Sequence, residues 1–505
     1  MAQPFGSGLQ GIIRSLDEAR SRKEQKRILR AFEAEGFDEN AMARGRLATL
    51  DDLLEKDLLS DTGVPIGQFV DETGQEHIIR HRRASSGAVY GQPGSGKDTT
   101  LVSSVLSECL DRSLFCIDVA EESFTMAGAY RSAKQNRDCI RIAPCSPGAA
   151  CYNPFSPMFD LLEAGEDLGL APYEMTPSLI PPAKASNTNG WVQSGAINLT
   201  AAILRHGVLL HGKNCTPGWL YDQLSGGAAT LETTFRHMIN SDDPVCMQAA
   251  MKYERLMQDS PREFALYVGE ASDRLLIYQT GSPFRASTNF SDISPADLKE
   301  GPVSVFLQIP GEQMYVARQY TATHMHSFIE GVAMAKGEQH RTRVLFLANE
   351  FTQIGPIAVL RKALRLYRKY GVQFLMYAQS RAAVEEIYGE EGRRDIEENC
   401  EFIQILGTDD PGLIQTISTW SGKMTAETHD VSVSGGPTPS VTHQFRQSTR
   451  PVLQSEDIRS LARNEQIIKY QNMPLILAQR RFWKDDERLR EIFEDPADIP
   501  GVVPG

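Results

Sequence analysis

The strongest constraint on this chain is a glycine-rich loop whose residues are Gly91, Gln92, Pro93, Gly94, Ser95, Gly96 and Lys97, followed by Asp98 and Thr99. Glycines in such a loop let successive backbone N–H groups turn onto one anion, because no Cβ blocks its approach. A short apolar run precedes the loop, and apolar residues at helical spacing follow it to Leu110. Strand, glycine loop, lysine and helix in this order indicate a P-loop NTPase, with residues 91–99 around the nucleotide phosphates.

A second nucleotide motif lies about 250 residues further on, where the apolar run 344–348 ends in Asn349 and Glu350. Asn349 stands where an Asp usually helps to hold magnesium, and Asp98 stands where the loop usually has Ser or Thr. Both expected metal-side positions, Asp98 and Asn349, are therefore altered.

Two interpretations of this altered pair remain open. In the first, the carboxylate has moved to Asp98, which binds magnesium directly while Asn349 holds a coordinated water. In the second, Asp98 repels the phosphates and the protein is a pseudo-ATPase. Like charges ~4 Å apart cost about 4 kcal/mol at an intermediate effective dielectric, so an unscreened Asp98 would weaken nucleotide binding.

Two further polar residues are catalytic candidates. Glu350 is the expected water-activating base, because a Glu beside the magnesium ligand has this role in such enzymes. Gln379, at the end of the next β-rich run, is a candidate sensor of the γ-phosphate. The alternatives are an ordinary strand-end carboxylate for Glu350 and a hydrogen-bonding group at the sheet edge for Gln379.

The remaining pattern predicts an α/β fold: a P-loop NTPase core with a mostly parallel sheet, interrupted by an all-α insertion domain. Short β-rich runs alternate with helical stretches, as in sheets covered on both faces. The expected division is an N-terminal helical segment (1–62), a first nucleotide-binding part (63–155), the all-α insertion (156–288), and a second nucleotide-binding part with a C-terminal tail (289–505). Residues 432–449, rich in Ser, Thr and Gly, predict a loop or hairpin.

The expected strands follow from runs of β-branched and aromatic residues. They are residues 87–90, 113–119, 139–143, 303–309, 343–348, 372–377 and 401–406, with 466–470 and 474–478 as later additions.

Composition limits the class of partner. The net charge is −13, so a nucleic-acid binder of this composition must gather its basic residues on one surface. No apolar stretch reaches the ~18 residues that a membrane helix needs. The eight cysteines have neither CxxC pairs nor metal-ligand spacing, which indicates thiols in a reducing cytoplasm.

A basic cluster follows the second motif in a predicted helix. Arg361, Arg365 and Arg368 share one face of that helix and would contact DNA phosphates without sequence preference. The alternative is a solvated helix face or a set of salt bridges.

Several segments in the right order resemble the type IV secretion coupling proteins, the TraG/TraD group of conjugative transfer. They are Asn349-Glu-Phe-Thr-Gln-Ile-Gly355, Tyr367-Arg-Lys-Tyr-Gly371, Ala378-Gln379-Ser380, Tyr152-Asn-Pro-Phe155, Gly190-Trp191, Gly407-Thr-Asp-Asp410 and Phe482-Trp483. The resemblance runs from about residue 43 to 485. One departure is the run after the second strand, where the family often has Asp-Pro-Lys-Gly-Glu and this chain keeps only the outer acids, Asp118 and Glu122.

The resemblance implies a RecA-like motor that uses ATP and Mg²⁺, assembles as a homohexameric ring, and works with type IV secretion channel components. Its cargo would be DNA bound to a relaxase, or effector proteins, and hydrolysis would drive export. The alternatives are a non-hydrolysing cargo receptor of the same system, or a ring DNA translocase unconnected with secretion. Family members usually carry N-terminal transmembrane helices, and this chain shows none. We therefore expect a cytoplasmic protein, peripheral at the cytoplasmic face of the bacterial inner membrane.

Overall fold

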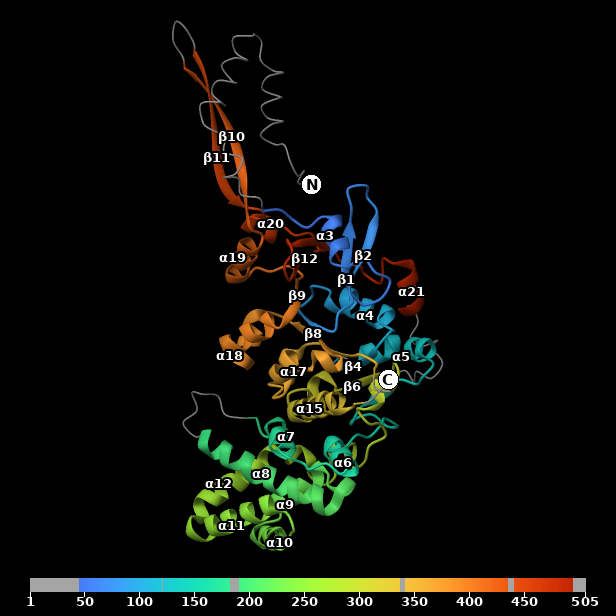
Figure 1. The fold of residues 1–505 in the computed structure, drawn as a ribbon, viewed down its shortest axis with the longest axis vertical. Coiled ribbons are helices and arrows are strands. Elements are labelled where there is room, and N and C mark those ends of the chain that lie inside the picture. The colour runs from blue at the N-terminus through green and yellow to red at the C-terminus, as the bar shows by residue number, and fades with distance from the viewer. Residues whose placement is uncertain (1–44, 120, 182–189, 337–340, 435–439, 494–505) are drawn as a thin grey trace. The chain divides into compact units, whose positions relative to one another are not determined.

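The computed structural model describes residues 45–119, 121–181, 190–336, 341–434 and 440–493 (Figure 1). Most of the predicted N-terminal helical segment, residues 1–44, lies outside this part of the chain. The structure forms two compact units. The larger unit contains Leu58–Gly67, Ile78–Gln404 and the segment from Arg480 onward, and the smaller contains Gln68–His77, Ile405–Gln479 and the residues up to Asp57. The four-part division expected from the sequence stays a prediction.

The larger unit is built on a parallel sheet in the strand order β9-β3-β8-β7-β4-β6-β5. Every pair from β3 to β5 is parallel, for example Tyr90 opposite Ala378 and Ala348 opposite Met376. In chain order the strands are β3 (Ser86–Tyr90), β4 (Ser113–Asp118), β5 (Ile140–Ile142), β6 (Ser304–Gln308), β7 (Val344–Ala348), β8 (Val372–Ala378) and β9 (Cys400–Ile405).

The core lies on both faces of this sheet, because every residue of β3, β4, β6, β7, β8 and β9 is buried. Aromatic rings fill one part of it: the ring centroid of Phe115 lies 4.5 Å from that of Phe328 and 5.6 Å from that of Phe346. Continuous apolar strands are typical of parallel sheets that helices cover on both sides.

Helices surround the sheet. Helix α5 contacts β4 and β6, whereas α15, α16, α17 and α18 contact β8. The bounds are η2 (Asp98–Val102), α4 (Ser103–Glu108), α5 (Glu122–Gln135), α15 (Arg318–Met334), α16 (Phe351–Ile354), α17 (Leu360–Leu366), η6 (Tyr367–Tyr370), α18 (Arg381–Glu398) and α21 (Glu487–Phe493). The predicted α/β fold with a mostly parallel sheet is confirmed.

The described residues from Ser156 to Ala286 form helices and no strand. Figure 1 shows α8 to α12 gathered in one group. The α-helices in this region are α6 (Ser156–Glu163), α7 (Ala171–Leu179), α8 (Gly190–His211), α9 (Pro217–Ser225), α10 (Ala228–Ile239), α11 (Pro244–Asp259), α12 (Pro261–Arg274) and α13 (Pro283–Ala286), and α14 (Asp297–Glu300) follows. At the base of the region, the Tyr152 N–H donates to the Ser287 carbonyl over 2.8 Å.

The smaller unit is antiparallel. Strand β12 (Glu465–Tyr470) pairs with β13 (Ile476–Gln479), and β13 pairs through Gln479 with Gln68 of β1 (Val64–Val70), a strand whose residues from Gln68 onward belong to this unit. The segment expected to be a loop or hairpin is a hairpin of β10 (Lys423–Ser434) and β11 (Ser440–Pro451). The other elements of this unit are α3 (Leu50–Glu55), α19 (Pro411–Trp420) and α20 (Ser455–Arg459), and β2 (Glu76–His81) begins in it and continues into the larger unit.

All the expected strands are present, within two residues of their predicted bounds. The sequence did not predict β1 or β2. Strand β1 contains Pro65 and Gly67, which are unusual inside strands, and β2 is largely polar. Among the described residues, no helix is long and apolar enough to cross a membrane.

Candidate functional site

The candidate site lies where three neighbouring parallel strands end. Gly91 follows β3, Gln379 follows β8 and Asn349 follows β7. Because the strands are parallel and in register, these residues meet at one edge of the sheet. The Gly91 N–H donates to the Ala378 carbonyl over 3.1 Å, which extends the β3–β8 pairing into the loop. Ligands of open parallel sheets bind at this carboxyl edge.

The glycine loop leaves β3 and turns directly into a helix. Gly94 and Gly96 have φ angles of +76° and +82°, in the left-handed region that favours glycine. The side chains of Gln92 and Pro93 are exposed, while Lys97 is buried. The Lys97 ammonium donates to the Gly91 carbonyl over 3.0 Å and lies 3.0 Å from Glu350 Oε1. The structure therefore brings together the two sequence motifs.

Asp98 and Asn349 are in direct contact. The Asn349 side-chain N–H donates to Asp98 Oδ1 over 2.7 Å, across 251 residues of sequence. Asp98 is exposed, whereas Asn349 is buried. The two altered positions thus form one pair.

The loop hydroxyls do not replace the missing Ser or Thr. The Thr99 and Thr100 hydroxyls both donate to the Gly96 carbonyl, over 3.2 and 2.6 Å. Thr100 is completely buried. Both hydroxyls therefore bond to the backbone just before the first helical turn, η2. Asp98 is the exposed side chain of this turn.

Glu350 has a constrained conformation. Its φ angle is +52°, a left-handed value that costs a non-glycine residue about 1 kcal/mol or more. The residue precedes α16 directly and its carbonyl accepts from the Gln353 N–H. Such strain is found where surrounding structure holds a functional group in place.

Ser95 Oγ, Asn349 Oδ1 and Glu350 Oε2 are among the polar atoms around the loop that are buried without a hydrogen-bond partner in the described part of the chain. Buried polar atoms are nearly always paired, so this group indicates that a bound ligand or its waters complete the site. A Cβ at Gly94 would meet nothing within 4 Å, so there is open space over the loop.

These residues fit a magnesium nucleotide. Among the described residues, no group of three or more His, Cys, Asp and Glu side chains is placed to hold a metal. The Asp98 carboxylate and the Asn349 amide oxygen are the described groups that would hold the metal, and Mg²⁺ commonly completes such a site with phosphate oxygens and water.

Sequence reasoning missed a segment that covers the loop. The Arg480 guanidinium donates to the Ser95 carbonyl, and the Trp483 N–H donates to the Thr99 carbonyl over 3.1 Å. A Cβ on Gly96 would lie 3.2 Å from the Phe482 ring. The only sequence signal was the Phe482-Trp483 resemblance to the family tail. Tyr377 was also missed: burial and the nearby charge of Asp98 raise its pKa well above the usual value.

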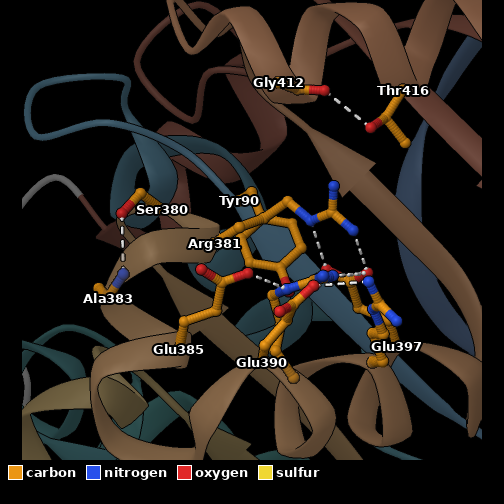
Figure 2. Close-up of polar contacts among 11 residues, drawn as sticks. Tyr90, Ser380, Arg381, Ala383, Glu385, Glu390, Glu397, Gly412 and Thr416 are labelled. Carbon is orange, nitrogen blue, oxygen red and sulfur yellow. Dashed lines mark hydrogen bonds and ion pairs between the residues drawn. The ribbon is translucent and has the colours of Figure 1, made fainter.

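A buried charge network lies beside the ends of β3 and β8 (Figure 2). Glu397 accepts hydrogen bonds from the Tyr90 hydroxyl, from Arg381 and from Arg393, over 2.6–2.8 Å. Tyr90 directly precedes Gly91, and Arg381 lies two residues after Gln379. Burial and the Glu397 carboxylate raise the pKa of Tyr90 well above its usual value, so Tyr90 stays a neutral donor. Through Glu397, helix α18 thereby contacts the last residue of β3 and the segment that follows β8.

The retained acid Asp118 has a structural role at the start of α5. It is buried at the end of β4 and accepts from the Ser123 and Phe124 N–H groups at the start of α5, over 3.0 and 3.1 Å. Gln308 donates to it over 2.9 Å. Burial raises the pKa of the Asp118 carboxyl above its usual value.

The predicted DNA-contacting arginines lie on α17 and η6, and all three are close to carboxylates. Arg361 and Arg365 both bind Asp395, with nitrogen–oxygen distances of 2.6 and 3.0 Å. Arg368 lies 3.9 Å from Glu401. The predicted roles of the site residues, from the loop to these arginines, stay predictions.

Comparisons with known proteins show which family this chain resembles. The family model described as type IV secretory system conjugative DNA transfer matches residues 46–500. The type IV secretion system-coupling protein VirD4 of Bartonella quintana is 24% identical over 411 residues, which cover 77% of this chain and 62% of that protein. The conjugal transfer protein TraG of Escherichia coli is 22% identical over 427 residues, which cover 79% of this chain and 65% of TraG. The chain thus spans less than two thirds of the length of these relatives.

Solved structures share the fold. The bacterial conjugative coupling protein TrwBdeltaN70, in its unbound form, superposes with a TM-score of 0.60 at 15% identity, over 87% of this chain and 93% of that one. Plasmid coupling protein TrwB in complex with ADP and Mg²⁺ gives a TM-score of 0.61 at 15% identity, over 87% and 94%.

Proposed function

The chain belongs to the type IV secretory conjugative DNA transfer family, and we propose that it is the coupling ATPase of such a system. It would bind ATP with Mg²⁺ at the edge of β3, β8 and β7, and would use hydrolysis to move DNA bound to a relaxase, or effector proteins, to the export channel. The observation that carries this proposal is the meeting of Lys97, Asp98, Asn349 and Glu350, with unpaired buried oxygen atoms among them.

Each residue has a role in this proposal. Magnesium bound with the nucleotide would neutralise charge on the β- and γ-phosphates. Lys97 would bind those phosphates, and Asp98 with Asn349 would hold the metal directly or through water. Glu350 positions and deprotonates the attacking water, and Gln379 contacts the γ-phosphate.

Further parts of the proposal follow from family membership. We assign residues 156–288 to cargo selection, and residues 63–155 with 289–505 to the motor. Six copies would form a ring beside the channel components, at the cytoplasmic face of the bacterial inner membrane. A DNA translocase unconnected with secretion is disfavoured by the family match.

One observation favours a second candidate, a non-hydrolysing cargo receptor. Glu350 is in an ion pair with Lys97, and an exposed carboxylate, Asp98, stands in the place of the loop hydroxyl. A site that holds its base in this way and repels phosphate would bind cargo without turnover.

Steady-state ATP hydrolysis, with and without single-stranded DNA, distinguishes the two. We expect turnover in the wild type, and a fall in kcat on the order of 10²-fold or more in Glu350→Gln with magnesium nucleotide still bound. Lys97→Ala should lose nucleotide binding. Glu390→Gln, an exposed change on α18, is the matched control and should behave as wild type. A wild type that binds magnesium ATP but shows no turnover under either condition would establish the receptor instead.

A further inference from the structure

The segment that directly follows β13 returns to the nucleotide loop, and we refer to its residues 480–493 as the strap. Arg480, the first residue of the strap, belongs to the larger unit and is only 6% exposed. Its guanidinium donates to the Ser95 carbonyl, and the Trp483 N–H donates to the Thr99 carbonyl over 3.1 Å. Arginine is rarely buried to this degree unless a specific partner holds it. The loop backbone is such a partner here.

The strap has anchors of its own. Arg481 bonds to Glu108 at the end of α4 over 2.6 Å and also pairs with Asp486. Helix α21, at the end of the strap, contacts α4 and α5. None of these contacts involves Arg480. The bond between Arg480 and the loop is therefore not what fastens the strap to the fold.

The Ser95 carbonyl has a donor from far away in the sequence, since Arg480 lies 385 positions further along the chain. Other loop carbonyls are held from within the loop or its first helical turn. Gly91 accepts from the Lys97 ammonium, Gln92 from the Ser95 N–H, and Gly96 from the Thr100 hydroxyl, over 3.0, 3.0 and 2.6 Å. The orientation of one loop peptide thus depends on a distant side chain.

That peptide joins Ser95 to Gly96. In a planar trans peptide the carbonyl and the following N–H point to opposite sides. A donor that fixes the Ser95 carbonyl therefore also fixes the direction of the Gly96 N–H, on the side away from Arg480. Gly96 has a φ angle of +82°, and its backbone rotates more freely than that of a residue with a Cβ. The guanidinium therefore restrains a peptide plane that glycine leaves loose.

We propose that Arg480 is a positioning residue of the nucleotide site: by holding the Ser95 carbonyl, it directs the Gly96 N–H at the phosphates of a bound nucleotide. This inference rests on the proposed function, since it requires nucleotide at the loop. The N–H groups of such loops cradle the α- and β-phosphates. Hydrogen bonds to charged oxygens are about twice as strong as neutral ones, so the direction of one N–H matters for affinity.

Arg480 acts through the loop and not by touching the nucleotide. Its side chain is buried, and its guanidinium bonds to the loop on the side opposite to that of the Gly96 N–H. The effect should therefore be on the loop itself, with or without ligand, and on binding of the phosphate chain more than on transfer of the γ-phosphate.

The first test is hydrogen exchange of the loop, measured by mass spectrometry on the full chain without nucleotide. The variant is Arg480→Met, which removes the guanidinium and keeps an apolar stem. The reporter is the Ser95 amide, whose N–H donates to the Gln92 carbonyl within the loop. We expect faster exchange in the peptide that covers residues 91–99. Unchanged exchange there would overturn the proposal, because a group that only touches the nucleotide would leave the loop as it is.

The second test is affinity, measured by calorimetry with magnesium ADP and with magnesium pyrophosphate. We expect Arg480→Met to weaken both by about tenfold, as for one misdirected hydrogen bond to a charged group. In ATP hydrolysis the KM should rise by a similar factor, with kcat within about twofold of wild type. A loss confined to ADP would show a contact with the nucleoside, and it would overturn the proposal.

The matched control is Arg481→Met, which removes the same charge from the next residue of the strap. Glu108 keeps Arg80 as a partner in this control. We expect a lower unfolding temperature, because the strap loses an anchor, but loop exchange as in wild type and ADP affinity within about twofold of it. Equal losses of affinity in the two Met variants would overturn the proposal, because they would show that the strap acts only as structural support.

Two further variants keep the test decisive. Arg480→Lys retains the charge and one donor, so it should lose less than about threefold in ADP affinity. Arg480→Gln has a side chain too short to reach the Ser95 carbonyl and should reproduce the loss even if Arg480→Met folds poorly. Wild-type affinity in Arg480→Gln, or a loss in Arg480→Lys as large as in Arg480→Gln, would overturn the proposal.

The outcome is separable from that of the proposed ATPase. A wild type that binds magnesium ADP but shows no ATP turnover, with faster loop exchange and weaker ADP binding in Arg480→Met, would contradict only the proposed hydrolysis. ATP turnover in the wild type, with loop exchange and affinity unchanged in Arg480→Met, would contradict only the positioning role of Arg480.

Discussion

The hydrogen bond between Asn349 and Asp98 explains how two unusual residues coexist. The Asn349 amide donates to the Asp98 carboxylate on the loop, so the acid is held beside the residue at which the usual Asp is missing. An Asp at position 349 would place two carboxylates in contact and lose this bond. The geometry therefore favours the interpretation in which the acid has moved from position 349 to position 98. Because the two side chains are in contact, the effects of substituting them should depend on each other.

We predict that Asp98 and Asn349 are energetically coupled through magnesium nucleotide. Asp98→Ser leaves no metal-side acid, and Asn349→Asp puts two acids beside the phosphates, so each change alone should weaken binding. The double exchange restores the usual arrangement and should recover affinity. The measurement is magnesium-dependent nucleotide affinity of the four proteins, with an expected coupling energy of at least ~1 kcal/mol.

The control for this cycle pairs Asp98→Ser with Arg394→Gln, an exposed change on α18, and should be additive. Strict additivity in the main cycle would reject the moved carboxylate. Nucleotide binding that arises only in the double exchange, from a wild type that binds none, would favour the pseudo-ATPase.

Helix α18 acts on the site through one carboxylate. Glu397 accepts from Tyr90 before the loop and from Arg381 after β8, and Arg393 completes its shell. The side chains of these two arginines are only 16% and 8% exposed. Because two guanidinium groups depend on it, the carboxylate is both a structural and a positioning group.

We predict that Glu397→Ala destabilises the protein by about 3 kcal/mol, because it leaves buried arginine charge without its partner. It should also weaken nucleotide binding, since Tyr90 and Arg381 flank the site. The matched control on the same helix is Glu390→Ala, which removes an exposed partner of Arg394 and should cost about 0.5 kcal/mol or less. Thermal unfolding and nucleotide affinity are the two measurements, and equal effects of the two variants would contradict the role of the network.

The larger unit contains both the candidate nucleotide site and a groove lined by Arg83, Arg343 and Lys369. The two places lie at opposite ends of β3, β7 and β8, so the same three strands connect them. The smaller unit contributes no residue to either described site.

We predict that the protein forms a homohexamer in the presence of nucleotide and single-stranded DNA. The reason is family membership, because RecA-like motors complete each nucleotide site with a neighbouring copy. Sedimentation velocity across a range of protein concentrations should show a species of six times the 56.0 kDa chain mass. A monomer at every concentration, with both ligands present, would contradict the ring.

Much of the fold was predictable from the sequence because its signals are local. Gly94, Gly96 and Lys97 determine the loop through backbone conformation and charge over a few residues. The buried strands are marked by their own apolar runs, so β4, β6, β7 and β8 were found close to their bounds. Strands β1 and β2 were missed because Pro65, Gly67 and polar residues hide their local pattern, and β1 pairs with β13, about 400 residues further along the chain.

The sequence by itself determined the P-loop, the alternation of strands and helices, and the resemblance to the coupling proteins. Tertiary structure alone decided which distant groups meet. It paired Asp98 with Asn349, placed Arg480 on the loop, and gathered Arg83, Arg343 and Arg368 into one groove. The physical reason is that contacts between residues hundreds of positions apart depend on strand order and register, which no local pattern of side chains encodes.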